Sequence, residues 1–200
     1  MRCFGDGDPL YEDYHDDEWG RPVGGERELF ERISLEAFQS GLSWITILRK
    51  REHFRAAFAG FDPETVARFA DRDVARLLAD AGIVRNRAKI EATIANARAL
   101  TAMREAGEDL ASLVWSHAPP DGSHRRPPRS FADIDAHTPQ SRALAKALKT
   151  RGFRFVGPTT AYAAMQACGL VNDHLARCRV RAAVDAERGA FSPPAPTPPG

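Results

Sequence analysis

One stretch of the sequence combines a lone carboxylate with an indole in otherwise uncharged surroundings. Between Ile33 and Leu48 the only ionisable side chain is Glu36, and Trp44 follows it beyond Gly41. Apolar surroundings disfavour the charged form of a carboxylate unless a donor lies nearby. If two helices meet near the glycine, the acid and the indole turn into one cleft that suits a planar, nitrogen-rich or cationic ligand. The alternative is a half-exposed or salt-bridged Glu36 on an amphipathic helix, with Trp44 in the core.

A second group of side chains has the chemistry of a metal site. His174 and Cys178 are four residues apart, so on a helix they lie one above the other at a normal two-ligand spacing for zinc. Cys3 and His15 could supply the other pair. Two thiolates and two imidazoles form a closed, tetrahedral set, so this zinc ion would be structural and would join the two ends of the chain. The alternative is a free thiol and a surface histidine.

The segment from Leu77 to Ile90, LLADAGIVRNRAKI, has the pattern of two helices joined by a tight turn. We expect the first helix to close at Gly82, which can adopt the backbone angles that a helix end requires. Backbone N–H groups of the turn would then point outwards beside Arg85, Arg87 and Lys89. Such a site binds phosphate without reading bases, because it uses backbone donors, a helix N-terminus and point charges. A routine corner with a solvated basic face is the alternative.

The elements that must position these groups are predicted to be helices throughout. Asp8 followed by Pro9 is typical of a helix start. The residues that share one face of this first helix are Tyr11, Tyr14, His15, Glu18 and Trp19. For Tyr11, packing in the core is the alternative. Further helices are expected to begin near Glu26, Ser43, Asp62 and Thr138, and Asp71 is expected to cap the helix that ends at Leu78. Residues 151–157, RGFRFVG, are predicted to be an extended loop, because no second strand is available to pair with them.

Composition predicts one soluble, globular domain. The chain has 200 residues, of which 43% are hydrophobic and 28% charged, and we assign residues 1–189 to a single domain and residues 190–200 to a mobile, proline-rich tail. No apolar run approaches the length of a membrane span, and the acidic N-terminus does not resemble a signal peptide, so a cytoplasmic location is expected. The three cysteines are too few for a disulfide framework and are expected to be thiols or metal ligands.

The net charge of +1 hides an uneven distribution of charge. No acid occurs between Asp135 and Asp173. The bases in that interval are Arg142, Lys146, Lys149, Arg151 and Arg154. A near-neutral protein with one basic face can bind a polyanion locally.

Several long motifs point to one family. They are RC near the N-terminus, DPLYEDYHDDEWG, LFERISLEAFQSGLSW, AGIVRNRAKI, and KALKTRGFRFVGPTTAYAAMQACGLVNDH with HLARC. Together they resemble the type I 3-methyladenine DNA glycosylases, a branch of the helix-hairpin-helix glycosylases, from Cys3 to Cys178. One departure concerns the N-terminal wall of the pocket, since members of the family usually have a tryptophan shortly after the first cysteine, where this chain has Phe4.

The resemblance implies an all-α, helix-hairpin-helix glycosylase fold and assigns three groups of residues. The base pocket would contain Glu36, Trp44 and Tyr14, flanked by Trp19 and Tyr11. A structural zinc ion would be held by Cys3, His15, His174 and Cys178. The DNA backbone would be bound in the helix-hairpin-helix at about residues 77–100, by Gly82, Ile83, Val84, Arg85, Arg87 and Lys89.

The expected activity is therefore release of 3-methyladenine from double-stranded alkylated DNA by a monomeric enzyme, with Glu36 as the catalytic residue. We expect no lyase step, because no lysine is placed in a desolvated pocket suited to a Schiff base. Two alternatives remain open at this stage. One is a glycosylase of different base specificity, and the other is a DNA-binding module without catalysis, although backbone binding requires neither Glu36 nor Trp44.

Overall fold

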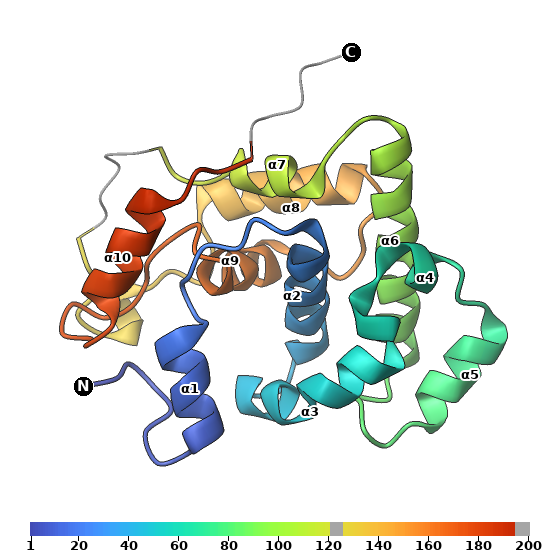
Figure 1. Ribbon diagram of the computed structural model, residues 1–200, viewed down its shortest axis with the longest axis horizontal. Coiled ribbons are helices and arrows are strands. Elements are labelled where there is room, and N and C mark those ends of the chain that lie inside the picture. The colour runs from blue at the N-terminus through green and yellow to red at the C-terminus, as the bar shows by residue number, and fades with distance from the viewer. Residues whose placement is uncertain (121–125, 195–200) are drawn as a thin grey trace.

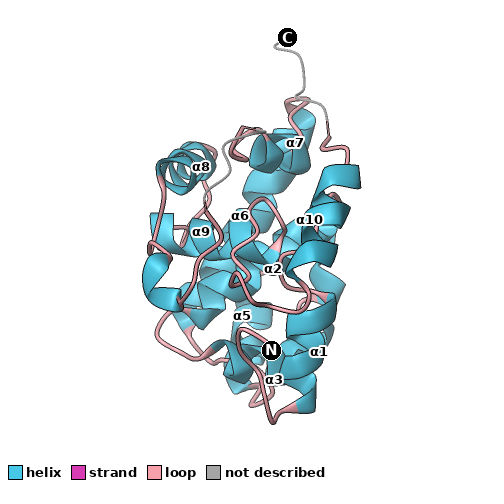
Figure 2. Cartoon of the chain, turned by 90° about the vertical axis from the view of Figure 1, so that its left-hand side faces the viewer, coloured by secondary structure: helices cyan, strands magenta, loops and turns pink. Residues whose placement is uncertain are grey.

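Helices joined by loops and turns form the described chain, which comprises residues 1–120 and 126–194 of a computed structural model (Figure 1). The α-helices are α1 (Pro9–Asp17), α2 (Glu26–Gln39), α3 (Trp44–Ala57), α4 (Pro63–Ala67), α5 (Asp71–Ala79), α6 (Arg87–Glu105), α7 (Leu110–Trp115), α8 (Pro139–Thr150), α9 (Pro158–Ala167) and α10 (Arg181–Ala190). Short 3-10 turns cover Ala59–Phe61 and Phe131–Asp133. No strand occurs in these described ranges, so the predicted all-α class is confirmed (Figure 2).

Side-chain caps explain several of the helix starts. Asp8 accepts a hydrogen bond from the backbone N–H of Tyr11 at 3.3 Å, and Pro9 occupies the first helical position. Asp62 caps α4 in the same way. The prediction for α5 was wrong by one residue, because Ala70 is the cap residue and Asp71 the first residue of the helix. Its N-terminal end is closed instead by Asp73, whose carboxylate accepts from the Ala70 N–H at 3.0 Å.

Helix α2 runs through the centre of the molecule and contacts α3, α6, α7 and α9 (Figure 1). Every residue from Ile33 to Phe38 is buried, so this part of α2 has no solvent-facing side. A cluster of phenylalanine rings from α2, α3 and the following turn packs beside it. An ionisable residue on this part of α2 must therefore lie in the interior, which determines the environment of Glu36.

The two ends of the chain pack on the same body. Segment 1–8 and α1 contact the loop before α10, where Arg179 pairs with Asp16. Ala190 is the last residue of α10 rather than the start of the tail, and the ring of Phe191 contacts Trp115 with centroids 4.6 Å apart. Of the expected tail, residues 195–200 lie outside the described residues. None of the described helices is long and apolar enough to cross a lipid bilayer.

Candidate active site and metal centre

Glu36 is an interior carboxyl group without a hydrogen-bonding partner. Glu36 is 6% exposed, and no described group donates a hydrogen bond to its carboxyl group or forms an ion pair with it. Burial raises its pKa to about 8, and the positive charge of Arg32 one helical turn earlier opposes that rise. The predicted desolvation is confirmed, and the alternative of a salt-bridged, half-exposed carboxylate does not hold. A carboxyl group that is buried and unpartnered is available to a ligand.

Aromatic rings from two other helices surround this carboxyl group. Tyr14 of α1 is buried and lies 5.2 Å from Trp44 of α3 between ring centroids. Tyr11 is half-buried, and its ring centroid is 6.5 Å from that of Tyr14. Burial, and then the charge of Glu36, raises the pKa of each tyrosine, so both hydroxyl groups lie within electrostatic range of the carboxylate. The buried indole nitrogen of Trp44 has no acceptor among the described residues. Helices α1, α2 and α3 thus direct an unpaired acceptor, an unpaired donor and aromatic faces into one place.

Phe4 forms the N-terminal wall of this aromatic group. Its ring contacts Tyr11 at 4.9 Å and Trp19 at 5.2 Å between centroids. Trp19 in turn lies edge-on to His174 at 4.6 Å. Trp19 therefore lies between Phe4, which packs on Tyr11, and His174 of the Cys/His cluster. Phe4, which stands where members of the family usually have a tryptophan, thus packs directly against Tyr11.

The four predicted metal ligands meet at one point although more than 150 residues separate the two pairs. The ligand atoms of Cys3, His15, His174 and Cys178 all lie within 4.8 Å of one another. The Cys178 Sγ is 3.4 Å from His15 Nε2 and 3.4 Å from His174 Nδ1. Two sulfur and two imidazole donors at these separations could hold one tetrahedral metal ion.

The surroundings of the cluster orient its ligands. His174 Nε2 is 2.9 Å from the backbone oxygen of Trp19, and His15 Nδ1 is 2.8 Å from a carboxylate oxygen of Asp16. Each imidazole can donate through that outer nitrogen and leave the inner one free to bind a metal. Burial lowers the pKa of His174 to about 4, so its ring is neutral at neutral pH. Burial raises the pKa of Cys3 to about 12, and only a bound cation would hold this thiol as the thiolate ligand.

The corner between α5 and α6 differs from its prediction in two respects. Helix α5 ends at Ala79, and the Gly82 N–H donates to Asp80 Oδ1 at 2.7 Å instead of pointing outwards. A Cβ atom at Gly82 would lie 2.7 Å from His53 Cδ2, so close packing and not a left-handed backbone requires the glycine. Ile83 is buried in the core, whereas Val84 is partly buried.

Lys89 was expected beside DNA but faces the interior. It is 7% exposed, and its Nζ donates to the backbone oxygens of Phe38 at 2.9 Å and Ser40 at 2.6 Å. A cation at the C-terminal end of α2 satisfies carbonyl groups that the helix leaves free. Of the other bases at this corner, Arg85 is exposed and Arg87 pairs with Glu91 at 3.3 Å.

A second corner, between α8 and α9, is also a candidate surface for binding a polyanion. These neighbouring helices are joined by residues 151–157, which form the predicted loop (Figure 2). At its tip Phe155 is 43% exposed and has a φ of 56°, a value that few side chains adopt. In the sequence, this surface was indicated by the interval without acids between Asp135 and Asp173, because its bases have no acid near them.

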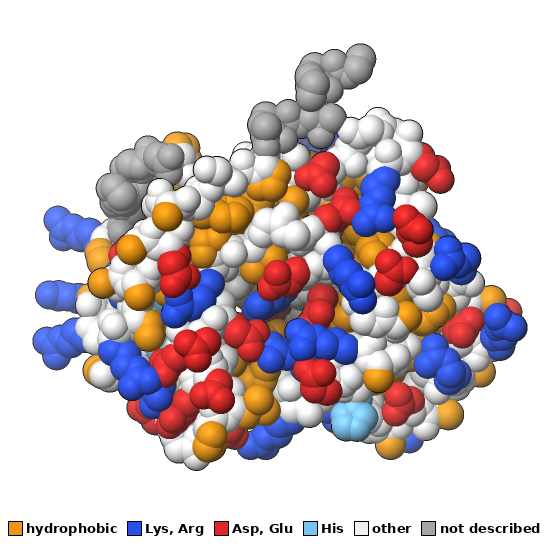
Figure 3. Space-filling view, in the orientation of Figure 1, with side chains coloured by type: hydrophobic (Ala, Val, Ile, Leu, Met, Phe, Trp, Pro, Cys, Tyr) orange, Lys and Arg blue, Asp and Glu red, His pale blue; other side chains and the backbone are white. Residues whose placement is uncertain are grey.

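Arg151 of this region pairs with Glu108, but other basic side chains here have no acidic partner among the described residues. In the described part of the chain, Lys146, Lys149 and Arg154 form no ion pair. Arg142, Lys146 and Lys149 line a surface hollow of about 480 Å³ against Pro158. By contrast, acidic and basic side chains intermingle on the face seen in Figure 3, where charges compensate one another.

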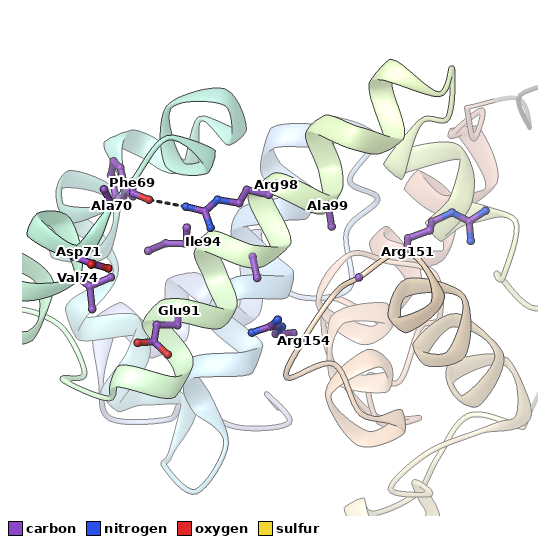
Figure 4. Close-up of a pocket in the computed structure, with 12 residues that line it drawn as sticks. Phe69, Ala70, Asp71, Val74, Glu91, Ile94, Arg98, Ala99, Arg151 and Arg154 are labelled. Atoms are coloured by element: carbon purple, nitrogen blue, oxygen red, sulfur yellow. Dashed lines mark hydrogen bonds between the residues drawn. The ribbon is translucent and has the colours of Figure 1, made fainter.

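A larger hollow lies between α5, α6 and the second corner (Figure 4). It measures about 580 Å³, and its walls include Asp71 of α5, Glu91 and Arg98 of α6, and Arg151 and Arg154 of the second corner. Arg98 is engaged there, because its guanidinium donates to the backbone oxygens of Ala67 and Phe69. None of the residues expected in the base pocket lines this hollow.

The fold and the site together define a class of protein. An all-helical body carries a buried, unpaired carboxyl group among aromatic rings, which is a site for one flat ring with a positive charge or hydrogen-bond donors. A family model described as methyladenine glycosylase matches residues 4–182. The chain therefore belongs to the methyladenine glycosylase family and is a glycosylase enzyme.

Individual relatives agree with this assignment. The chain is 52% identical over 174 residues to DNA-3-methyladenine glycosylase 1 of Escherichia coli (strain K12), and the match covers 86% of this chain and 91% of the relative. A crystal structure of 3-methyladenine DNA glycosylase I superposes with a TM-score of 0.85 at 53% identity, covering 90% of this chain and 98% of that one. A tyrosine-to-phenylalanine variant of a 3-methyladenine DNA glycosylase I, crystallised with 3-methyladenine, has a TM-score of 0.83 at 34% identity and covers 90% and 96%.

Proposed function

We propose that this protein removes 3-methyladenine from double-stranded alkylated DNA by hydrolysing the N-glycosidic bond, and that it acts as a monomer. The observation that carries the proposal is the buried carboxyl group of Glu36, which has no hydrogen-bond donor among the described residues and acts electrostatically on Tyr14, whose ring packs against Trp44. The crystallised complex of a relative with 3-methyladenine supports the choice of base. An alkylated adenine is cationic, and a damaged base is easier to extrude from the duplex than a paired one.

Departure of the base requires little catalytic assistance from the enzyme. The glycosidic bond of a cationic base is already weak, and the base leaves as a neutral molecule, so it need not be protonated. Trp44 stacks on the ring, and Glu36 accepts from the exocyclic amine and attracts the positive charge. Attraction in the ground state alone raises affinity. Glu36 accelerates the reaction because its charge still acts as positive charge moves onto the sugar.

The activity is proposed to be monofunctional, without a lyase step. A Schiff-base mechanism requires a desolvated lysine whose amine is free. The four lysines of the chain do not meet that requirement. Lys89 is buried but donates to two carbonyl groups, Lys50 donates to the backbone oxygens of Ala81 and Gly82, and Lys146 and Lys149 lie at the surface.

We further propose that the Cys/His cluster holds zinc and that the ion is structural. A set of two thiolates and two imidazoles leaves no open position for substrate. Through Cys3 and His15 the ion would hold the N-terminal segment in place, and with it Phe4, which closes the wall of the aromatic group.

The function is tested by incubating the protein with methylated duplex DNA and chromatographing the released bases. We expect 3-methyladenine to be released catalytically, and the DNA strand to stay intact until alkali or heat cleaves the abasic site. Release of a different methylated base would point to the rival specificity. Binding without release of any base would point to a DNA-binding module, and strand cleavage without alkali would contradict the monofunctional assignment.

DNA backbone contacts are proposed at both corners, with Arg85 and Arg87 at the first and Lys146 and Lys149 at the second. Removal of both lysines is expected to weaken binding to unmodified duplex by about 10-fold or more at low salt, because phosphate contacts release counterions. The slope of log K against log salt should become shallower by about 0.9 for each phosphate that the variant no longer neutralises. Fluorescence anisotropy at several salt concentrations measures both quantities for Lys146→Ala/Lys149→Ala and Arg85→Ala/Arg87→Ala.

A matched control removes two cations from another part of the surface. Arg68 and Arg72 lie outside both corners, so Arg68→Ala/Arg72→Ala lowers the net charge by the same amount. If this control weakens binding and flattens the salt dependence as strongly as either test pair, the effect is one of net charge and the assignment of the corners is wrong.

A further inference from the structure

We propose that Arg32 is a positioning residue for Glu36, one that sets the charge of this carboxyl group and clamps together the three helices that carry the base pocket. The inference rests on the proposed role of Glu36 in base recognition. Arg32 lies on α2 one helical turn before Glu36, so the two side chains share a face of the helix.

The guanidinium of Arg32 lies largely out of solvent, and both of its ion pairs within the described ranges are made by one nitrogen. Its side chain is 11% exposed, and Nη2 lies 3.1 Å from Glu28 and 3.4 Å from Glu18. Nη1 is buried and has no acceptor among the described residues. Little water screens this charge, so it acts on the neighbouring Glu36 although two other carboxylates pair with it.

The same arginine connects the elements of the pocket. Glu18, which follows α1, also accepts two hydrogen bonds from Arg51 of α3. The chain Arg32, Glu18, Arg51 therefore joins α2, the end of α1 and α3. These are the helices that present Glu36, Tyr14 and Trp44, so one network positions all three side chains.

Within the described part of the chain, Arg32 is the cation that acts on Glu36. From α1, the groups facing Glu36 are Tyr11 and Tyr14, and from the end of α9 it is Cys168. Burial raises the pKa of all three, so they are neutral at neutral pH and cannot compensate a carboxylate. In the absence of hydrogen-bond donors, ionisation of Glu36 depends on Arg32 until a cationic base arrives.

The test compares Arg32→Met, Arg32→Lys and Arg51→Met. In the unmodified protein the acid limb of kcat/KM for base release should lie near pH 8, where Glu36 ionises. Arg32→Met is expected to move this limb up by about 1 pH unit or more and to lower kcat/KM at pH 7 by roughly 10-fold, with recovery at higher pH only to the lower maximum that the loss of the Glu18 contact leaves. Arg32→Lys keeps the charge and should restore the limb. Arg51→Met removes the contact between Arg51 and Glu18 but leaves the charge of Arg32 near Glu36. It should therefore lower the maximum of kcat/KM at high pH without moving the acid limb of the profile.

A direct titration separates this inference from the proposed function. Carbon-13 NMR of glutamate-labelled protein, assigned with Glu36→Gln, follows the Glu36 carboxyl group whether or not the enzyme releases a base. An upward shift of its midpoint in Arg32→Met, reversed in Arg32→Lys, supports the inference. An unchanged midpoint overturns it, as does a loss of activity in Arg32→Met that is the same at every pH. If no base is released but the midpoint shifts, the proposed function fails while the coupling of Arg32 to Glu36 stands.

Discussion

Glu36→Gln is expected to reduce the rate of 3-methyladenine release by about 100-fold or more while binding of duplex DNA at low salt survives. Glutamine keeps the size of the side chain and an acceptor oxygen but removes the negative charge, and loss of one preorganised electrostatic contact costs about 10²–10³ in kcat. Single-turnover excision from methylated DNA measures the first quantity and anisotropy with unmodified duplex the second. Equal loss of both would assign Glu36 a structural role.

Glu36→Gln is expected to increase the stability of the protein although it reduces the activity, and the size of the increase depends on pH. Burial raises the pKa of Glu36 to about 8, from an ordinary value of 4.5. The folded state therefore holds the proton more tightly than the unfolded state, and the stability that this provides is complete below pH 4.5 and is lost as pH rises through 8. We expect Glu36→Gln to match the unmodified protein at low pH and to exceed its free energy of unfolding by about 2–4 kcal/mol at pH 9.

Urea denaturation of both proteins across this pH range measures the difference, and contributions from other titrating groups cancel in the comparison. A glutamate retained only for packing would show the reverse, with the variant less stable at every pH. Reduced excision together with increased stability would mark a residue whose burial costs folding energy and serves function.

Metal removal is the second large expected effect. Each purified molecule should contain about one zinc ion, and Cys178→Ser should lower the free energy of unfolding by about 3–5 kcal/mol, because metal binding to a closed site contributes directly to folding. The released base should remain 3-methyladenine, since the cluster lies behind Trp19 and Phe4 rather than among the residues proposed to contact the base. Atomic absorption and thermal denaturation measure the zinc content and the stability.

Cys168→Ala provides the matched control. Cys168 is also a buried free thiol, but it is not in the cluster, so its replacement should leave the zinc content unchanged. Protein that is purified without zinc, is fully active and is as stable as the zinc-loaded form would contradict the assignment.

Local sequence was sufficient where local geometry decides the structure. Asp8 with Pro9 and Asp62 with Pro63 begin helices as predicted, because a cap needs only a short side chain and the backbone two or three residues on. The burial of Glu36 was likewise predictable from its uncharged neighbours. His174 and Cys178 were candidates from their spacing alone, but their assignment to one site with Cys3 and His15 rested on the family resemblance, since no rule of spacing relates Cys3 to Cys178 across the chain.

Tertiary structure decided the direction in which side chains point and what they meet there. The first corner carries the three bases Arg85, Arg87 and Lys89 in close succession, yet Lys89 turns inward because the end of α2 presents carbonyl groups to it. Gly82 is required by the proximity of His53, a residue 29 positions earlier that local pattern cannot place. That Glu36 has no donor and Arg32 an unpaired edge among the described residues is also a property of packing, because partners are set by which helices meet and not by the order of residues along the chain.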